Sequence, residues 1–177
     1  MKLLRTIRLD PSDQHVFTKA ADPGEWAVSG AFAFWERPVE ALIGKERAAF
    51  RSGLLGISSL GWSTLAVVTE LTAQERAGAV EELAERLLAF FGAPDMEMAR
   101  EAAEQEIAYS ETLAEPHVGT LIAVHRNVEA GEIRERFRTL LPGVDDKHAR
   151  VFSFVMEEGD VPEERVDLMN LKRESGL

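Results

Sequence analysis

The stretch TAQERAGAVEELAERLLAFFG, residues 72–92, predicts a long amphipathic helix with a sequence signal at each end. Thr72 and Glu75 form a capping-box pattern, in which each side chain can accept the other residue's free backbone N–H. Gly92 is placed to end the helix in a left-handed cap. The apolar residues of this helix recur at helical spacing and form a single stripe: Val80, Leu83, Ala84, Leu87 and Phe91.

A second helix is expected after a short link, over residues 94–113. Pro94 suits a first helical turn. The stripe of this helix is narrower and has smaller side chains: Met96, Ala99, Ala103, Ile107 and Ser110. Because a short link makes two helices neighbours, we expect an antiparallel helical hairpin.

Residues 26–35 alternate between bulky and small side chains and predict a strand. Trp26, Phe32 and Phe34 would share one face, while the other face would be nearly bare from Ala27 to Ala33. A bare face lets a helix or a ligand approach the backbone. We interpret the aromatic residues, together with Trp35 and Trp62, as core, and the alternative is that they line a pocket.

The remaining pattern predicts further strands and two shorter helices. The strands are expected over residues 2–9, 15–19, 62–69, 119–128 and 151–156, and the helices over residues 38–51 and 129–140. The fold class is α+β, with a mostly antiparallel mixed sheet of five or six strands covered by the helical hairpin and the two shorter helices. Residues 1–156 are expected to form a single domain. Residues 157–177 would be an acidic C-terminal extension packed on it or flanking it.

Composition excludes several classes of function. The chain has 177 residues, 31 acidic and 20 basic side chains, a net charge of −11 and no cysteine. The absence of cysteine excludes disulfides, thiolate metal sites and a cysteine nucleophile. The acidic balance argues against a nucleic-acid partner, which requires a basic face. Arg5 and Arg8 interrupt the apolar start and no membrane-length apolar run follows, so we expect a cytoplasmic protein without membrane association.

The sequence contains none of the common local motifs of catalysis. Gly53, Gly56 and Gly61 have the wrong spacing for a dinucleotide-binding loop, and neither a phosphate-binding loop nor a nucleophile elbow is present. The four histidines are far apart in sequence and lack metal-ligand spacing. We therefore predict no catalytic residue, no metal site and no cofactor.

His125 and Arg126 end the apolar strand expected over residues 119–128. Adjacent strand residues point to opposite faces, so each is judged alone. Polar residues at a strand end commonly mark where the sheet meets solvent, and Arg126 can also be part of a structural ion pair. The functional interpretation places Arg51, Ser63, His125 and Arg126 around an anionic small molecule.

Four stretches carry a resemblance to a known family, at residues 24–32, 49–56, 61–65 and 119–126. In these stretches the chain resembles an uncharacterised family of small proteobacterial proteins of unknown function, over roughly residues 1–155. Similar proteins tend to be encoded beside accessory proteins for molybdenum and iron–sulfur oxidoreductases. The resemblance thus implies a helper role in a metallo-oxidoreductase system and assigns no site residue.

Three functions remain open. The first is a non-enzymatic accessory or binding protein with a protein partner. The second is an enzyme or binder of an anionic small molecule at the Arg/His site. The third is a structural homodimer, since soluble proteins often assemble as two-fold dimers.

Overall fold

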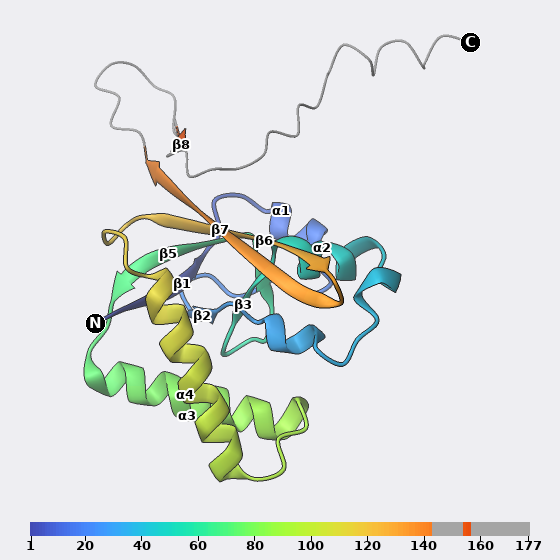
Figure 1. Cartoon of the computed structure of the whole chain (residues 1–177). Helices are drawn as coiled ribbons and strands as arrows, with labels where there is room; N and C mark the ends of the chain where they lie inside the picture. Colours follow the sequence, from blue (N-terminus) through green and yellow to red (C-terminus); the bar gives the residue numbers. More distant parts are fainter. Residues whose placement is uncertain (143–153, 157–177) are drawn as a thin grey trace.

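A single antiparallel sheet organises the molecule (Figure 1). The computed structural model describes residues 1–142 and 154–156. The strand order is β4-β3-β2-β1-β5-β6-β7-β8. Seven strands lie within residues 1–142: β1 (Lys2–Ile7), β2 (Trp26–Val28), β3 (Leu54–Gly56), β4 (Trp62–Ser63), β5 (Leu65–Glu70), β6 (Leu121–Glu129) and β7 (Glu132–Pro142). The short β8 (Phe154–Met156) adds to the edge at β7.

Four α-helices surround this curled sheet in the described part of the chain. They are α1 (Ser12–Val16), α2 (Gly44–Ser52), α3 (Ala73–Phe90) and α4 (Met96–Leu113). Two short 3-10 helices, η1 (Ala31–Phe34) and η2 (Val39–Ala41), lie between β2 and α2. The α+β class is confirmed, but the predicted count of five or six strands is too low.

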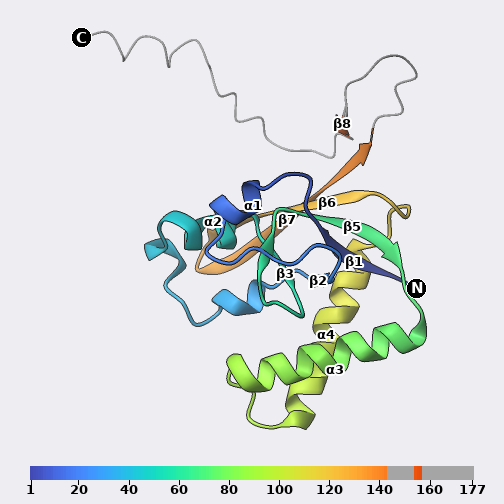
Figure 2. The same ribbon diagram turned by 180° about the vertical axis from the view of Figure 1, so that it is seen from behind.

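The helical hairpin is confirmed. Thr72 and Glu75 form the capping box at the start of α3, and Asp95 caps α4 by accepting from the Met98 N–H. The helices run antiparallel, because Arg76 near the start of α3 pairs with Glu111 near the end of α4. Their axes cross steeply in both views (Figure 2).

The core has three parts, set by strand alternation and the curl of the sheet. Leu3, Val28 and Leu55 face α3 and α4 on one side of the sheet. Leu4 and Val124 belong to the cluster on the opposite face. The third part gathers apolar side chains around α2: Phe17, Phe34, Leu42, Ala49 and Phe50.

The predicted strand over residues 26–35 is wrong beyond Val28. Gly30 adopts a left-handed conformation (φ 79°), and the chain turns into η1. The expected bare face from Ala27 to Ala33 therefore does not exist as one surface. Glycine permits this turn because it lacks a Cβ atom.

The predicted helix over residues 129–140 is also wrong, because β7 occupies this segment. Glu129 pairs with Glu132 around a two-residue turn, in which Ala130 (φ 51°) and Gly131 (φ 78°) both have positive φ. Such turns join antiparallel strands tightly. The charged residues of the segment alternate across a long hairpin with β6 instead of covering a helix.

Three smaller predictions also change. The strand over residues 15–19 is replaced by α1 and the turn after it, and the helix over residues 38–51 divides into η2 and α2. The strand over residues 62–69 divides into β4 and β5. The structure describes only the last three residues of the strand expected over residues 151–156, and they form β8. Residues 151–153 and the predicted extension over residues 157–177 lie outside the described residues.

None of the helices in the described ranges is both long and apolar enough to cross a membrane.

Candidate functional site

Arg126 is the largest fully buried side chain within residues 1–142, with none of its surface exposed. It lies on β6 and shares a face with Ile122 and Val124, which strand alternation requires. A buried guanidinium needs partners for its five N–H donors. The surroundings of Arg126 therefore define the most strongly organised polar group in the fold.

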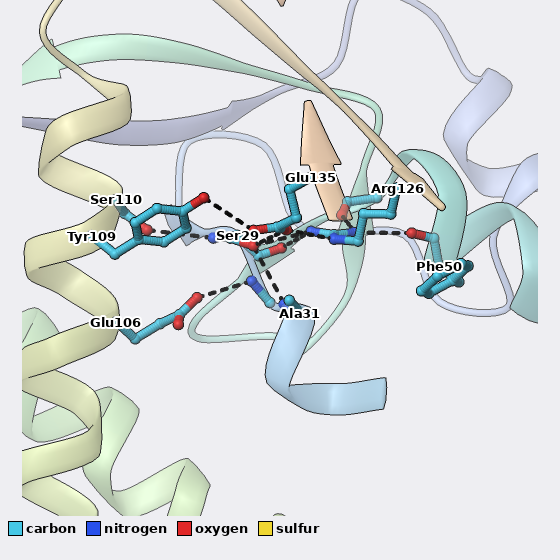
Figure 3. Close-up of polar contacts among 10 residues, drawn as sticks. Ser29, Ala31, Phe50, Glu106, Tyr109, Ser110, Arg126 and Glu135 are labelled. Atoms are coloured by element: carbon cyan, nitrogen blue, oxygen red, sulfur yellow. Dashed lines mark hydrogen bonds and ion pairs between the residues drawn. The ribbon is translucent and has the colours of Figure 1, made fainter. Parts of the chain in front are cut away.

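All five donors of Arg126 are engaged by protein atoms (Figure 3). Nε donates to Glu135 Oε1 at 2.7 Å. Nη1 donates to the carbonyl oxygens of Phe50 (3.1 Å) and Gly53 (2.7 Å) at the end of α2. Nη2 donates to the backbone carbonyl and the hydroxyl of Ser29, which follows β2. One side chain thus joins β6 to β7, α2 and β2.

Helix α4 completes what we call the Arg126 cluster, which comprises Ser29, Glu106, Tyr109, Ser110, Arg126 and Glu135 (Figure 3). The Tyr109 hydroxyl donates to Glu135 Oε2 at 3.1 Å. The Ser29 hydroxyl donates to Glu135, and the Ser29 N–H donates to Ser110 Oγ at 3.4 Å. The Gly30 N–H donates to Glu106 Oε1 at 3.1 Å. The cluster therefore links the β6–β7 hairpin to helix α4 and to the segment that follows β2.

Burial controls the protonation of this cluster. It raises the pKa of Glu106, with a further raise from the charge of Glu135, while the Gly30 N–H and Arg126 lower that pKa. Burial and Glu135 raise the pKa of Tyr109 to about 12, so the phenol stays protonated and donates at neutral pH. Burial lowers the pKa of Arg126, and the adjacent carboxylates oppose this. The Arg126 guanidinium thus shares one buried site with the carboxyl groups of Glu106 and Glu135.

The four predicted site residues occupy different environments. Arg126 is buried, whereas His125 is exposed on the opposite face of β6. Arg51 is exposed on α2, close in sequence to the carbonyl groups that Arg126 binds. Ser63 is buried and donates to the carbonyl oxygens of Ile7 (3.2 Å) and Leu65 (2.7 Å).

These positions bear on the predicted anionic ligand. The donors of Arg126 already have protein acceptors, so an anion would have to displace one of them. The hydrogen bonds of Ser63 and those of Arg126 share no partner. A common binding role for the four residues stays a prediction.

Sequence reasoning missed the other members of the cluster. The sequence predicts a helix over residues 129–140, and a helix does not place Glu135 opposite Arg126 as the β6–β7 register does. Glu106 and Tyr109 lie on the helix expected over residues 94–113 but outside the apolar stripe that the sequence predicts for it. The available signal was the alternation in β6, which places Arg126 on the same face as two apolar residues.

A comparison with protein-family models matches residues 1–155 to a family of unknown function. The chain belongs to the DUF6505 family. No curated protein and no solved structure matches it. The matched range contains every residue of the Arg126 cluster in this DUF6505 chain.

The DUF6505 chain also carries an exposed aromatic patch, which we define as Phe32, Trp35, Phe90 and Phe91. The Phe32 ring meets Trp35 edge-on with centroids 6.5 Å apart and meets Phe91 edge-on at 5.0 Å. Trp35 is 71% exposed and Phe90 is 63% exposed. The core interpretation of the aromatic residues thus fits the buried Phe34 but not Trp35.

Metal ligation has no obvious place in the described ranges. Within residues 1–142 and 154–156, no group of three or more histidine or acidic side chains converges so that it could hold a metal ion.

Proposed function

We propose that this protein is an accessory protein that binds another protein through the aromatic patch. The observation that carries the proposal is the Phe32 ring, which contacts both the 71% exposed Trp35 and Phe91, with the 63% exposed Phe90 preceding Phe91 in the chain. Water-exposed tryptophan and phenylalanine in one group are uncommon on a monomer surface and mark interaction sites. The helper role implied by the family resemblance belongs to this proposal.

The patch is held rigidly, which favours binding. Phe32 packs against the core formed with α3 and α4, and the Phe91 N–H bonds to the Leu87 carbonyl at the end of α3. Aromatic side chains lose little conformational entropy when they bind, and they dominate the energetics of many interfaces. An apolar segment of a partner can therefore dock here at a small ordering cost.

The Arg126 cluster supports the same proposal, because its hydrogen bonds are made within the protein. Its guanidinium has no donor left for a substrate among the contacts described above. We assign the cluster a structural role, in which it fixes β2 and so the η1 segment that carries Phe32 and Trp35. On this proposal, binding takes place on the surface, supported by a closed polar interior.

The test compares a double variant, Trp35→Ser with Phe90→Ser, against a matched control, Leu9→Ser with Val118→Ser. The control removes two other exposed apolar side chains, which are 40% and 53% exposed. The full chain is tagged, cross-linked in cells of its source and analysed by quantitative mass spectrometry. We expect the patch variant to lose its partner by roughly 30-fold, as truncated aromatic anchors do, and the control to retain it.

Sedimentation of the purified chain separates the alternatives. Self-association that the patch variant abolishes would assign the patch to a homodimer instead of a different partner. Equal partner recovery with the patch variant and the control would refute the proposal.

A further inference from the structure

A small hollow lies on a different part of the surface, between η1, α2 and the segment that follows α1. Its volume is about 140 Å³. Its lining is apolar at Phe34, Ala49 and Trp62 and positively charged at Lys19, Arg37 and Lys45. No member of the Arg126 cluster lines it.

The floor of the hollow is apolar and fixed. Phe34 and Trp62 contact one another with ring centroids 5.2 Å apart at an angle of 31°. Ala49 is buried on α2, and Phe34 is also in edge-on contact with Phe50. Phe34 is only 2% exposed and the Arg37 guanidinium lies 5.8 Å from its ring centroid, so the partly exposed Trp62 ring offers the surface for a small apolar group.

The rim of the hollow is positive. Three cations and one carboxylate line it, although the chain as a whole carries a net charge of −11. The carboxylate belongs to Glu46, which forms an ion pair with Arg37 (Nη2 to Oε1, 2.8 Å). Lys19 and Lys45 have no ion-pair partner among the residues that the structure describes. Two ammonium groups thus remain available above an apolar floor.

We propose that this hollow binds a short-chain organic carboxylate, held by Lys19 and Lys45 with its alkyl group on the Trp62 ring, which packs on Phe34. A hollow of about 140 Å³ suits a small organic anion, and propionate and butyrate are examples of this size. The charge of the rim selects an anion, because an ammonium group binds a carboxylate through charge-assisted hydrogen bonds. The apolar floor favours an alkyl carboxylate over a fully hydrated inorganic anion.

This site differs from the anionic site predicted from sequence. Arg51, Ser63, His125 and Arg126 do not line it. It is also independent of the proposed docking of a protein partner, because Phe34 faces the hollow while Phe32 and Trp35 belong to the aromatic patch.

The test is a titration of the full chain with sodium propionate at constant ionic strength, followed by the NMR signal of the Trp62 indole N–H. A Trp62→Phe variant assigns that signal. We expect a saturable shift. Lys19→Gln with Lys45→Gln should weaken propionate binding by about tenfold, since each exposed charge pair contributes somewhat under 1 kcal/mol. Arg47→Gln with Arg138→Gln, which removes two exposed cations outside the hollow, should change it by less than twofold.

Two further probes decide the ligand chemistry. Propionamide has the shape of propionate without its charge and should bind at least tenfold more weakly. Inorganic phosphate has the charge without the alkyl group and should also bind more weakly than propionate. The proposal is overturned if the Trp62 signal does not saturate, if the two double variants lose affinity equally, or if either probe binds as tightly as propionate. Because both lysines are exposed, we expect the rest of the amide spectrum to be unchanged in the variant.

Discussion

Arg126 and Glu135 face each other across β6 and β7, and Nε of the arginine donates to Oε1 of the glutamate at 2.7 Å. Arg126 is fully buried and the Glu135 side chain is 12% exposed. The same guanidinium binds carbonyl groups from α2 and from the end of β2. A pair that is local within one hairpin therefore organises segments that are distant in the sequence.

We predict that Arg126→Met destabilises the fold by about 3–5 kcal/mol, because it leaves the buried Glu135 carboxylate without its cation and leaves the carbonyl groups of Phe50, Gly53 and Ser29 without this donor. Glu135→Gln should cost less, about 1–3 kcal/mol, because the amide oxygen can still accept from Nε. Urea unfolding followed by circular dichroism measures both. The matched control is Arg136→Met, since Arg136 lies next along β7 and its side chain is 54% exposed. Similar losses for Arg126→Met and Arg136→Met would contradict a structural role for the buried pair.

Sequence patterning predicts the helices better than the sheet. The Thr72–Glu75 capping box and the apolar stripe of α3 depend on residues within a few turns of one another, so local spacing is sufficient. The β6–β7 hairpin depends on the positive φ of Ala130, which is uncommon for alanine. A turn centred on Asn-Gly would have been recognisable, but Ala-Gly carries little signal.

The site was less predictable than the fold. The alternation in β6 places Arg126 on an apolar face, but its hydrogen-bond partners come from β7, the end of α2 and the residue after β2. Helix α4 joins the cluster only through Glu135, Ser29 and Gly30. Which elements meet there depends on the curl of the sheet, and no local pattern encodes it. The aromatic patch shows the same limit, because Phe32 and Phe91 meet only after β2 ends at Val28.

The raised pKa of Glu106 predicts how stability changes with pH. The folded state retains this proton above the ordinary pKa of 4.5, so it binds more protons than the unfolded chain in that range. Stability from this group therefore falls as pH rises above 4.5. Glu106→Gln removes the titration and keeps an oxygen that can accept from the Gly30 N–H.

We expect the melting temperature of Glu106→Gln, relative to that of the natural chain, to increase from pH 4.5 upward and then level off. Differential scanning calorimetry at intervals up to pH 8 measures this difference. Glu101→Gln, an exposed change on the same helix, should show no such increase. A difference that decreases with pH would mean that attraction by Arg126 outweighs the cost of burial.

The β6–β7 turn predicts a stabilising substitution. Ala130 has φ 51°, a conformation that costs an L-residue with a Cβ atom about 1–2 kcal/mol and that asparagine adopts more readily. Ala130→Asn should therefore stabilise the chain by about 0.5–1 kcal/mol. Gly131→Ala, at φ 78°, should destabilise it. Thermal unfolding of both variants gives the comparison, and a loss of stability with Ala130→Asn would refute the assigned turn.

Gly30 predicts a larger loss, because two effects act at the same position. Its φ of 79° disfavours any side chain, and a Cβ atom there would lie 2.5 Å from Leu55 Cβ and 3.1 Å from the Trp62 ring. Gly30→Ala should cost about 2–4 kcal/mol, the sum of backbone strain and overpacking.

Gly24→Ala separates the two effects at Gly30. Gly24 has a similar φ of 85°, but a Cβ atom there would meet nothing within 4 Å. It should therefore show the backbone cost alone, about 1–2 kcal/mol. Urea unfolding of both variants measures the difference, which is the packing cost at the point where β2 turns into η1. Equal losses would show that Leu55 and Trp62 move aside freely and that packing adds no cost at Gly30.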